Sequence, residues 1–298
     1  MITFKQYLAE EVIASKRKNM MHLQQMKPLE FLDWVQSMHN EFGGVLKNLE
    51  VSLKVDGLGA RFGKSKEGEF FFEGSRTGPV FKEKAFSTYA KEKGSKQEII
   101  DRAAHYDDIF DILKASAAVK AVPANAKVVC EIFYNPMASE ADGHLTFVTV
   151  KYDKSKLGSK MTIIPITVID ATTGEDHPDK DKILKALFKT SSNEIKIIDA
   201  KLKASDIDIR AVTKSVLKFG DHERVVIKSL KAADKPEKAA LIAAVQKAKD
   251  ELAEFLLTHK GVEGKDKLGK DIEGLVFSAG DHTVKVTTQE FKDSKKKA

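Results

Sequence analysis

The sequence has little of several residue types that would point to particular protein classes. Its 298 residues include one cysteine, Cys130, so no intramolecular disulfide can form and no cysteine-rich zinc site can be built. Such sparse cysteine usage is typical of proteins in a reducing compartment. The longest apolar runs, such as 161–169, fall well short of the roughly 20 residues that a membrane-spanning helix needs. The eight histidines show no H-x-x-x-H or H-x-H spacing, so we expect no dedicated metal cage.

The composition is that of a packed protein with a heavily charged surface. Hydrophobic residues make up 42% and charged residues 32%, which excludes disordered, collagen-like and low-complexity chains. The length allows one large domain or two ordinary ones. The net charge of +6 comes from 50 lysines and arginines against 44 aspartates and glutamates, a mild excess that only weakly indicates a polyanionic partner.

Hydrophobic periodicity predicts an α+β fold, with mostly antiparallel sheets and helices packed outside them. The expected helices cover 1–18, 28–42, 95–118 with Ser95 as N-cap, 179–190, 207–217 and 236–259. The expected strands are an antiparallel set within 45–81, then 127–134, 145–152 and 161–169, and a final pair at 272–278 and 282–287.

These elements predict one main domain with additions. We expect an N-terminal helix at 1–18, a domain over 19–290, and a basic tail at 291–298. Within the domain, the lysine-rich stretch 172–270 is expected to be a helical insertion. Its lysines either follow a phosphate backbone or form an ordinary solvated face, and the sequence leaves both interpretations open.

The segment Lys54-Val55-Asp56-Gly57 stands where an apolar strand runs into a glycine turn. A lysine at a rigid strand end, with small neighbours, is placed to act as a covalent nucleophile. That chemistry needs an unprotonated amine, and with an ordinary pKa of about 10.4 the site must favour the neutral form. Taken alone, the same four residues describe a surface lysine beside a β-turn.

Four further segments follow in a particular order and carry a resemblance. They are Ser75-Arg76-Thr77-Gly78, 128–133 around Glu131, Glu273-Gly274-Leu275-Val276-Phe277, and 283–286 around Lys285. Together with Lys54-Val55-Asp56-Gly57 they resemble the covalent nucleotidyltransferase superfamily of ATP-dependent DNA ligases, RNA ligases and mRNA capping enzymes. The resemblance implies an adenylation-domain fold of antiparallel sheets flanked by helices, ATP-grasp-like. Capping enzymes and full DNA ligases of the family add an OB-fold domain after the last motif. Because only 13 residues follow Lys285, we expect no OB-fold domain in this chain.

The resemblance also assigns roles to residues. Lys54 would be the catalytic nucleophile that takes AMP, and Lys285 would contact the α-phosphate and assist it. Glu273 and Glu131 would serve a Mg²⁺ or Mn²⁺ ion, and Glu131 would also contact the ribose. The ATP-binding set that it implies is Lys54, Asp56, Gly57, Arg61, Arg76, Glu131, Tyr152, Glu273 and Lys285, with Ser75 and Arg76 also at the nucleic acid.

The chain departs from the family pattern at three places. An arginine commonly follows the nucleophile by five residues, but here that position is Gly59 and the nearest arginine is Arg61. A second lysine is usual two residues after Lys285, where this chain has Thr287. The adenine-stacking aromatic is not marked by a motif; Tyr152 is the candidate, and a role as core filler is an equal alternative.

These observations predict an ATP-dependent polynucleotide ligase, with nicked DNA as the expected substrate. Ligases of the family that use NAD⁺ carry an extra N-terminal domain and a four-cysteine zinc module, for which this chain has no room, so ATP is the expected donor. RNA end joining is the first alternative, with the same chemistry on another acceptor. The second is an inactive ligase-like protein packaged in a phage head.

The extreme N-terminus bears on that second alternative. Residues 1–10 resemble the capsid-targeting leader of tailed-phage internal head proteins, and Leu8-Ala9-Glu10 fits the rule for cleavage after Glu10. An ordinary amphipathic helix is the competing interpretation. We expect a monomer that acts in the cytoplasm of an infected bacterium or inside the virion, without membrane contact.

Overall fold

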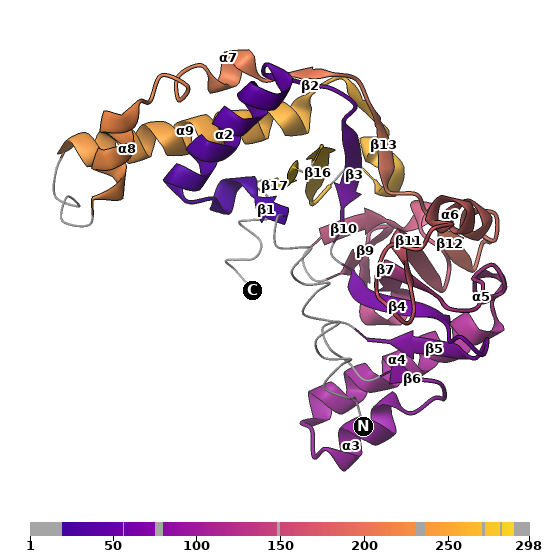
Figure 1. Ribbon diagram of the computed structural model, residues 1–298. Coiled ribbons are helices and arrows are strands. Elements are labelled where there is room, and N and C mark those ends of the chain that lie inside the picture. Colours follow the sequence, from indigo (N-terminus) through magenta and orange to yellow (C-terminus); the bar gives the residue numbers. More distant parts are fainter. Residues whose placement is uncertain are drawn as a thin grey trace. The chain divides into compact units, whose positions relative to one another are not determined.

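The computed structural model describes residues 20–55, 57–74, 80–147, 150–229, 236–269, 272–280 and 282–288. Helices combine with sheets whose strands are mostly antiparallel, which confirms the α+β class (Figure 1). The chain forms two compact units. Unit 1 comprises the described residues of Val55–Ala200 and Lys267–Asp271, and unit 2 comprises those of Lys18–Lys54, Lys201–Asp266 and Ile272–Ala298. The expected leader at 1–10 lies outside the described residues.

Unit 1 is built on a six-stranded sheet with the strand order β12-β11-β7-β4-β5-β6. The strands are β4 (Leu58–Lys64), β5 (Phe70–Glu73), β6 (Val80–Phe81), β7 (Ala126–Tyr134), β11 (Met161–Asp170) and β12 (Ile195–Ile197). A smaller sheet joins β8 (Ser139–Ala141), β9 (His144–Phe147) and β10 (Val150–Asp153). The helices are α3 (Phe86–Glu92), α4 (Gln97–Ala115), α5 (Ala117–Lys120) and α6 (Lys180–Phe188), with short 3₁₀ turns at Asn135–Met137 and Lys154–Lys156.

The core of unit 1 lies on one face of this sheet. Alternate residues of β4 and β7, among them Phe62, Val128 and Ile132, are almost fully buried there. Helices α3, α4 and α5 cover this face with residues such as Phe86 and Leu113. Because side chains alternate along a strand, the residues between them point to the opposite face of the sheet.

Unit 2 is built on a second six-stranded sheet, ordered β1-β17-β16-β3-β13-β15. The strands are β1 (Met20–His22), β3 (Glu50–Lys54), β13 (Lys201–Ala204), β15 (Val262–Glu263), β16 (Gly274–Ala279) and β17 (His282–Thr287). A separate pair joins β2 (Val45–Leu46) and β14 (Ile207–Asp208). The helices are α2 (Pro28–Phe42), α7 (Arg210–Thr213), α8 (Asp221–Lys228) and α9 (Pro236–Thr258), with 3₁₀ turns at Leu23–Gln25 and Lys265–Leu268.

One face of the unit 2 sheet is apolar and packs on helices. Val51, Leu53, Leu275, Phe277 and Val286 are buried on it. Helix α9 contacts β17 and also α2, and the two helices lie side by side in Figure 1. The opposite face of the sheet therefore carries the alternate residues of β3, β16 and β17.

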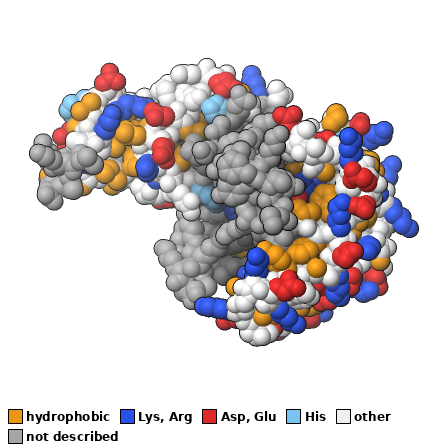
Figure 2. All heavy atoms as spheres, turned by 60° about the horizontal axis from the view of Figure 1, so that its bottom comes forward, with side chains coloured by type: hydrophobic (Ala, Val, Ile, Leu, Met, Phe, Trp, Pro, Cys, Tyr) orange, Lys and Arg blue, Asp and Glu red, His pale blue; other side chains and the backbone are white. Residues whose placement is uncertain are grey.

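Residues 172–270, expected to be one insertion, are divided between the two units. Helix α6 and strand β12 belong to unit 1, whereas β13, β14 and helices α7 to α9 belong to unit 2. On the molecular face shown in Figure 2, lysines and arginines are interspersed with aspartates and glutamates, so the excess of positive charge forms no broad single-sign field there.

Candidate active site

The register of the unit 2 sheet brings Lys54 and Lys285 onto one face. Gly274 pairs with both Lys54 and Thr287, so these three form one row across β3, β16 and β17. The next row on the same face of the sheet runs across five strands and contains His22, Lys285, Val276, Ser52 and Lys201. Residues directly opposite one another on neighbouring strands share a face. Lys54 and Lys285 therefore lie in adjacent rows of one sheet face, although 230 positions separate them in the sequence.

Lys54 forms an ion pair with Glu273. The Glu273 side chain is fully buried and that of Lys54 is 12% exposed. Apart from this ion pair, neither oxygen of Glu273 has a hydrogen-bond partner among the described residues. Because a buried carboxylate retains its charge only when it is neutralised, the Lys54 ammonium favours the ionised form of Glu273.

Gly274 keeps the row between Lys54 and Thr287 free of a side chain. A Cβ atom at position 274 would lie 2.1 Å from the carbonyl oxygen of Val286 and 2.9 Å from the Cα of Thr287, both backbone atoms. Thr287 stands where the family pattern has a second lysine. It is buried, and its carbonyl oxygen accepts a hydrogen bond of 2.8 Å from the side chain of Gln24. Position 287 is thus part of the packed structure.

The polar face of the unit 1 sheet carries two more expected residues, Arg61 and Glu131. Gly59 pairs directly with Glu131 on β7, and Arg61 pairs with Glu73 on β5. The Arg61 guanidinium forms a 3.2 Å ion pair with Glu73, whose other oxygen receives the ammonium of Lys127 at 2.9 Å. All three side chains are less than one-fifth exposed. The buried carboxylate of Glu73 therefore holds Arg61 in place on β4, between Gly59 and Gly63.

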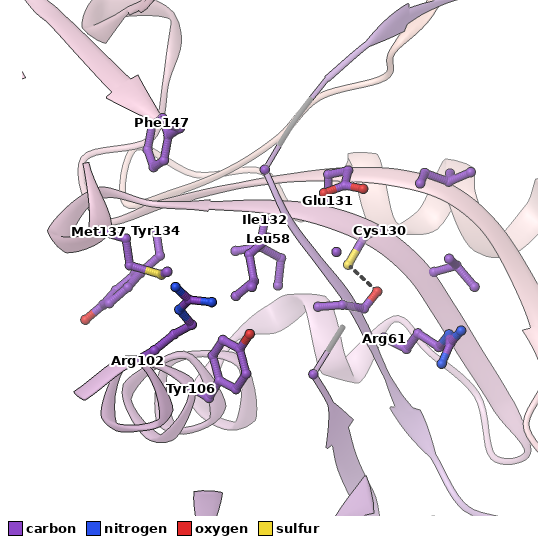
Figure 3. Close-up of a pocket in the computed structure, with 16 residues that line it drawn as sticks. Leu58, Arg61, Arg102, Tyr106, Cys130, Glu131, Ile132, Tyr134, Met137 and Phe147 are labelled. Carbon is purple, nitrogen blue, oxygen red and sulfur yellow. Dashed lines mark hydrogen bonds between the residues drawn. The ribbon is translucent and has the colours of Figure 1, made fainter. Parts of the chain in front are cut away.

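A cavity of about 660 Å³ opens along β4 and β7 (Figure 3). Of the expected residues, Gly57, Arg61 and Glu131 line it, together with Gly59. On the helical side, Arg102 and Tyr106 of α4 lie close to Leu58 in Figure 3. The volume is within the range of small-molecule sites, roughly 300–1,000 Å³.

Tyr152 does not line this cavity. Only 2% of the residue is exposed, and its ring packs on Phe133 and Phe147 with centroid distances of 4.6 and 6.1 Å. Of the two interpretations that the sequence leaves open, this geometry favours core packing. Phe147, from the same aromatic cluster, is the residue that borders the cavity.

Sequence reasoning missed Glu73, Lys127, Arg102 and Tyr106. A carboxylate in an apolar strand, as in Phe70–Glu73, was the available signal for Glu73, because a buried acid needs a cationic partner. No local pattern marks Arg102 or Tyr106, which the fold brings to β4 from a separate helix. Asp56, Ser75 and Arg76 lie outside the described residues.

Cys130, next to Glu131, belongs to the opposite face of β7. It is 1% exposed, and its thiol donates a 3.5 Å hydrogen bond to the carbonyl oxygen of Ala60. Burial, followed by the nearby Glu131 carboxylate, raises the pKa of the thiol well above its ordinary value. A thiol kept protonated in this way is not a nucleophile.

The described residues include no cluster of three or more histidine, cysteine or acidic side chains that could hold a metal ion by themselves. Glu273, with two buried oxygens and one lysine partner, fits a site in which one carboxylate is completed by substrate oxygens, as is usual for Mg²⁺. No helix in the described part of the chain is both long and apolar enough to cross a membrane.

Comparison with known proteins identifies no family. No protein-family model matches the chain, and no curated protein sequence matches it.

Proposed function

We propose that the protein is an ATP-dependent polynucleotide ligase that carries AMP on Lys54. Two observations together carry the proposal: Lys54 and Lys285 lie in adjacent rows of one face of the unit 2 sheet, and Glu273, just before β16, forms an ion pair with Lys54. These residues come from three separate segments that each resemble a motif of the family. A purely structural lysine would not require a second lysine in the neighbouring row.

In the proposed first step, the Lys54 amine attacks the α-phosphorus of ATP. A nitrogen–phosphorus bond forms, the bond between the α-phosphorus and its bridging oxygen breaks, pyrophosphate leaves, and the amine loses a proton. Lys285 lies one row away on the same face and would stabilise negative charge that develops on the α-phosphate. AMP would then pass to the 5′-phosphate of a strand, and an adjacent 3′-hydroxyl would displace it.

Glu273 has two tasks in this proposal. Without substrate, it pairs with Lys54 and holds the ammonium at the end of β3. With substrate, Glu273 would be the carboxylate ligand of Mg²⁺, an ion that neutralises charge on the triphosphate. Once Glu273 is engaged by a cation other than Lys54, it no longer stabilises the ammonium form of the lysine, which favours loss of the proton.

The test is covalent labelling with ATP that carries radioactive phosphorus at the α-position, in MgCl₂ or MnCl₂. On the wild type we expect covalent label that is released by acid and stable to alkali, as a nitrogen–phosphorus bond requires. The label should be lost in Lys54→Arg, which keeps a cation for Glu273 but offers no comparable nucleophile. Lys47→Arg, at an exposed lysine of unit 2, is the matched control and should label normally. No label on the wild type, or full label on Lys54→Arg, would overturn the proposal.

The acceptor is tested separately from the labelling. Labelled protein is chased with nicked DNA, nicked RNA and single-stranded 5′-phosphorylated RNA. We expect transfer of AMP to nicked DNA; faster transfer to an RNA end would replace DNA by RNA as the acceptor. Wild-type protein that neither labels nor binds ATP would instead favour the ligase-like protein without activity.

A further inference from the structure

Helix α4 places an arginine and a tyrosine on the wall of the unit 1 cavity. Arg102 and Tyr106 are four residues apart, which puts them on the same face of the helix. Both line the cavity, and Figure 3 shows both side chains rising from α4 toward Leu58. The roles assigned above to Lys54, Lys285 and Glu273 do not use either residue.

The Tyr106 ring is held in one orientation. It makes edge-on contacts with Phe86 and Phe72, with centroid distances of 5.5 and 6.3 Å. On another side it meets the backbone of Gly74, where an added Cβ would lie only 2.8 Å from a ring carbon. A half-buried ring fixed by two aromatic neighbours is a preorganised surface for a planar group.

Arg102 is an isolated positive charge in an acidic stretch of α4. Asp101, Asp108 and Asp111 lie near it in the sequence and are exposed. No ion pair within the described part of the chain involves Arg102, whereas Asp111 pairs with Lys84. A phosphate backbone running along this helix would meet repulsion from these acids at each step, whereas a single phosphate at Arg102 would have the arginine charge as its direct partner.

We propose that Arg102 and Tyr106 form a subsite for one nucleoside 5′-phosphate, with the phosphate on Arg102 and the base against Tyr106. The walls suit such a ligand, because Leu58, Ile132 and Met137 are apolar and Tyr134 adds a second ring. The nucleoside 5′-phosphate comes from one of two sources: a free nucleotide or the 5′-terminal nucleotide of a strand. The choice of ligand class rests on the proposed ligase function.

The experiment measures binding without any adenylation chemistry. The probes are 5′-AMP, which has no pyrophosphate to lose, and a short single strand with a fluorophore at its 3′ end and either a phosphate or a hydroxyl at its 5′ end. Adenosine is the matching hydroxyl probe for AMP. Dissociation constants are compared for the wild type, Arg102→Ala, Arg102→Lys, Tyr106→Ala and Tyr106→Phe.

We expect the 5′-phosphate to tighten binding of at least one probe pair, and Arg102→Ala to remove about tenfold or more of that preference, as a lost charge-assisted hydrogen bond implies. Arg102→Lys should restore part of it. Tyr106→Ala should weaken the phosphate and hydroxyl probes equally, and Tyr106→Phe should bind as the wild type does. Lys120→Ala, which removes an exposed positive charge of unit 1 outside the cavity, should keep the full preference.

The outcomes separate the sources and separate this inference from the ligase proposal. If Arg102→Ala loses the preference for a 5′-phosphate only with the strand probes, the 5′ end of a strand occupies the subsite. If it loses this preference only with AMP against adenosine, the free nucleotide occupies it. Dissociation constants of Arg102→Ala that equal those of Lys120→Ala for every probe would overturn the proposed subsite. Because no covalent step is needed, that result is distinct from a failure of Lys54 to take label.

Discussion

The carboxylate of Glu273 determines the charge balance around Lys54. Its two oxygens are buried, and Lys54 is their ion-pair partner. A neutral amide of the same shape at position 273 would remove this ion pair with Lys54 and the proposed carboxylate ligand of the metal. A substitution at position 273 therefore tests the proposed role of this site in adenylation without changing the nucleophile Lys54.

We expect Glu273→Gln to lower the rate of Lys54 labelling by about 100-fold or more, the order of magnitude lost when one preorganised group that stabilises the transition state is removed. The rate is measured from label incorporation at several Mg²⁺ concentrations. Glu254→Gln, at an exposed acid of α9, is the control and should label at the wild-type rate. A Glu273→Gln protein as active as this control would mean that the carboxylate has no part in the chemistry.

Glu73 is a second residue whose charge is compensated inside the protein. It forms ion pairs with both Arg61 and Lys127, and its side chain is 7% exposed. Removal of one partner from a buried ion pair typically costs about 3–5 kcal/mol, because the remaining charge stays buried and unpaired. Here the two cations that remain are themselves slightly exposed, so the lower end applies.

Glu73→Ala should therefore reduce the free energy of unfolding by about 3 kcal/mol in urea denaturation. Glu69→Ala is the comparison. Glu69 directly precedes β5, the strand that carries Glu73, and its ion pair with Lys82 is exposed. Such exposed pairs are screened by solvent and contribute little to stability. Equal effects of the two substitutions would show that Glu73 is not a buried structural charge.

At the scale of elements, pairing of β16 with two neighbours makes position 274 intolerant of a side chain. The obstructing atoms belong to the backbone of β17, so a shift of one side chain does not relieve the contact. Strands β16 and β17 must separate locally; β17 carries Lys285, and β16 also pairs with β3, which carries Lys54. A side chain at position 274 should therefore affect both the free energy of unfolding and the labelling of Lys54.

Gly274→Ala should lower the free energy of unfolding by about 1–3 kcal/mol, as overpacking does. It should also reduce Lys54 labelling in the fraction that remains folded. Gly220→Ala makes the same chemical change at a position where the nearest atom would be 3.5 Å from the added Cβ. It should lower neither the stability nor the labelling of Lys54. Normal labelling by a folded Gly274→Ala protein would show that the strand spacing is unimportant for the site.

The helices and strands could be predicted where one strong period runs between clear breaks. The predicted helix at 28–42 is α2 residue for residue, and the last two predicted strands are β16 and β17 within two residues at their ends. The predicted N-cap Ser95 is wrong, because α4 begins at Gln97 and the backbone N–H of Ser95 donates to Ala90 after α3. The single strand predicted at 145–152 is a hairpin, β9 and β10.

The region 207–217 shows why a helical pattern alone was insufficient. Ile207 and Asp208 pair with β2, which lies far away in the sequence, so only Arg210–Thr213 is helical. Contacts of this kind are non-local and leave no periodic signal. The same reason applies to the site: Lys54, Glu273 and Lys285 stand in motifs, whereas Arg102 and Tyr106 come to the cavity only through packing.

At the scale of the whole molecule, each unit carries one natural reporter. Trp34, the one tryptophan of the chain, is buried in α2 of unit 2, and Cys130, the one cysteine, is buried in β7 of unit 1. Neither unit is a single continuous stretch of chain. Folding of unit 1 brings residues 54 and 201 together and so reduces the entropy cost of closing the unit 2 sheet.

We expect the two units to unfold together for this reason. In urea, the midpoint of Trp34 fluorescence should coincide with the midpoint at which Cys130 reacts with a thiol reagent. Trp34→Phe and Cys130→Ala each remove one signal and identify its source. Midpoints that differ clearly would mean that each unit is stable without the other.

The pairing of β3 with β13 has a consequence for how such a chain could arise. Ser52 faces Lys201 in an antiparallel register, so all of Val55–Ala200 occupies the place of the loop in an ordinary β-hairpin. In evolutionary terms, a large folded segment inserted at that loop would leave the strand pairing of its host intact, as domain insertions at loops generally do. Lys54 is then the last residue of the host before the insertion begins. An exchange of 55–200 for another folded segment would therefore leave the proposed nucleophile in place at the end of β3.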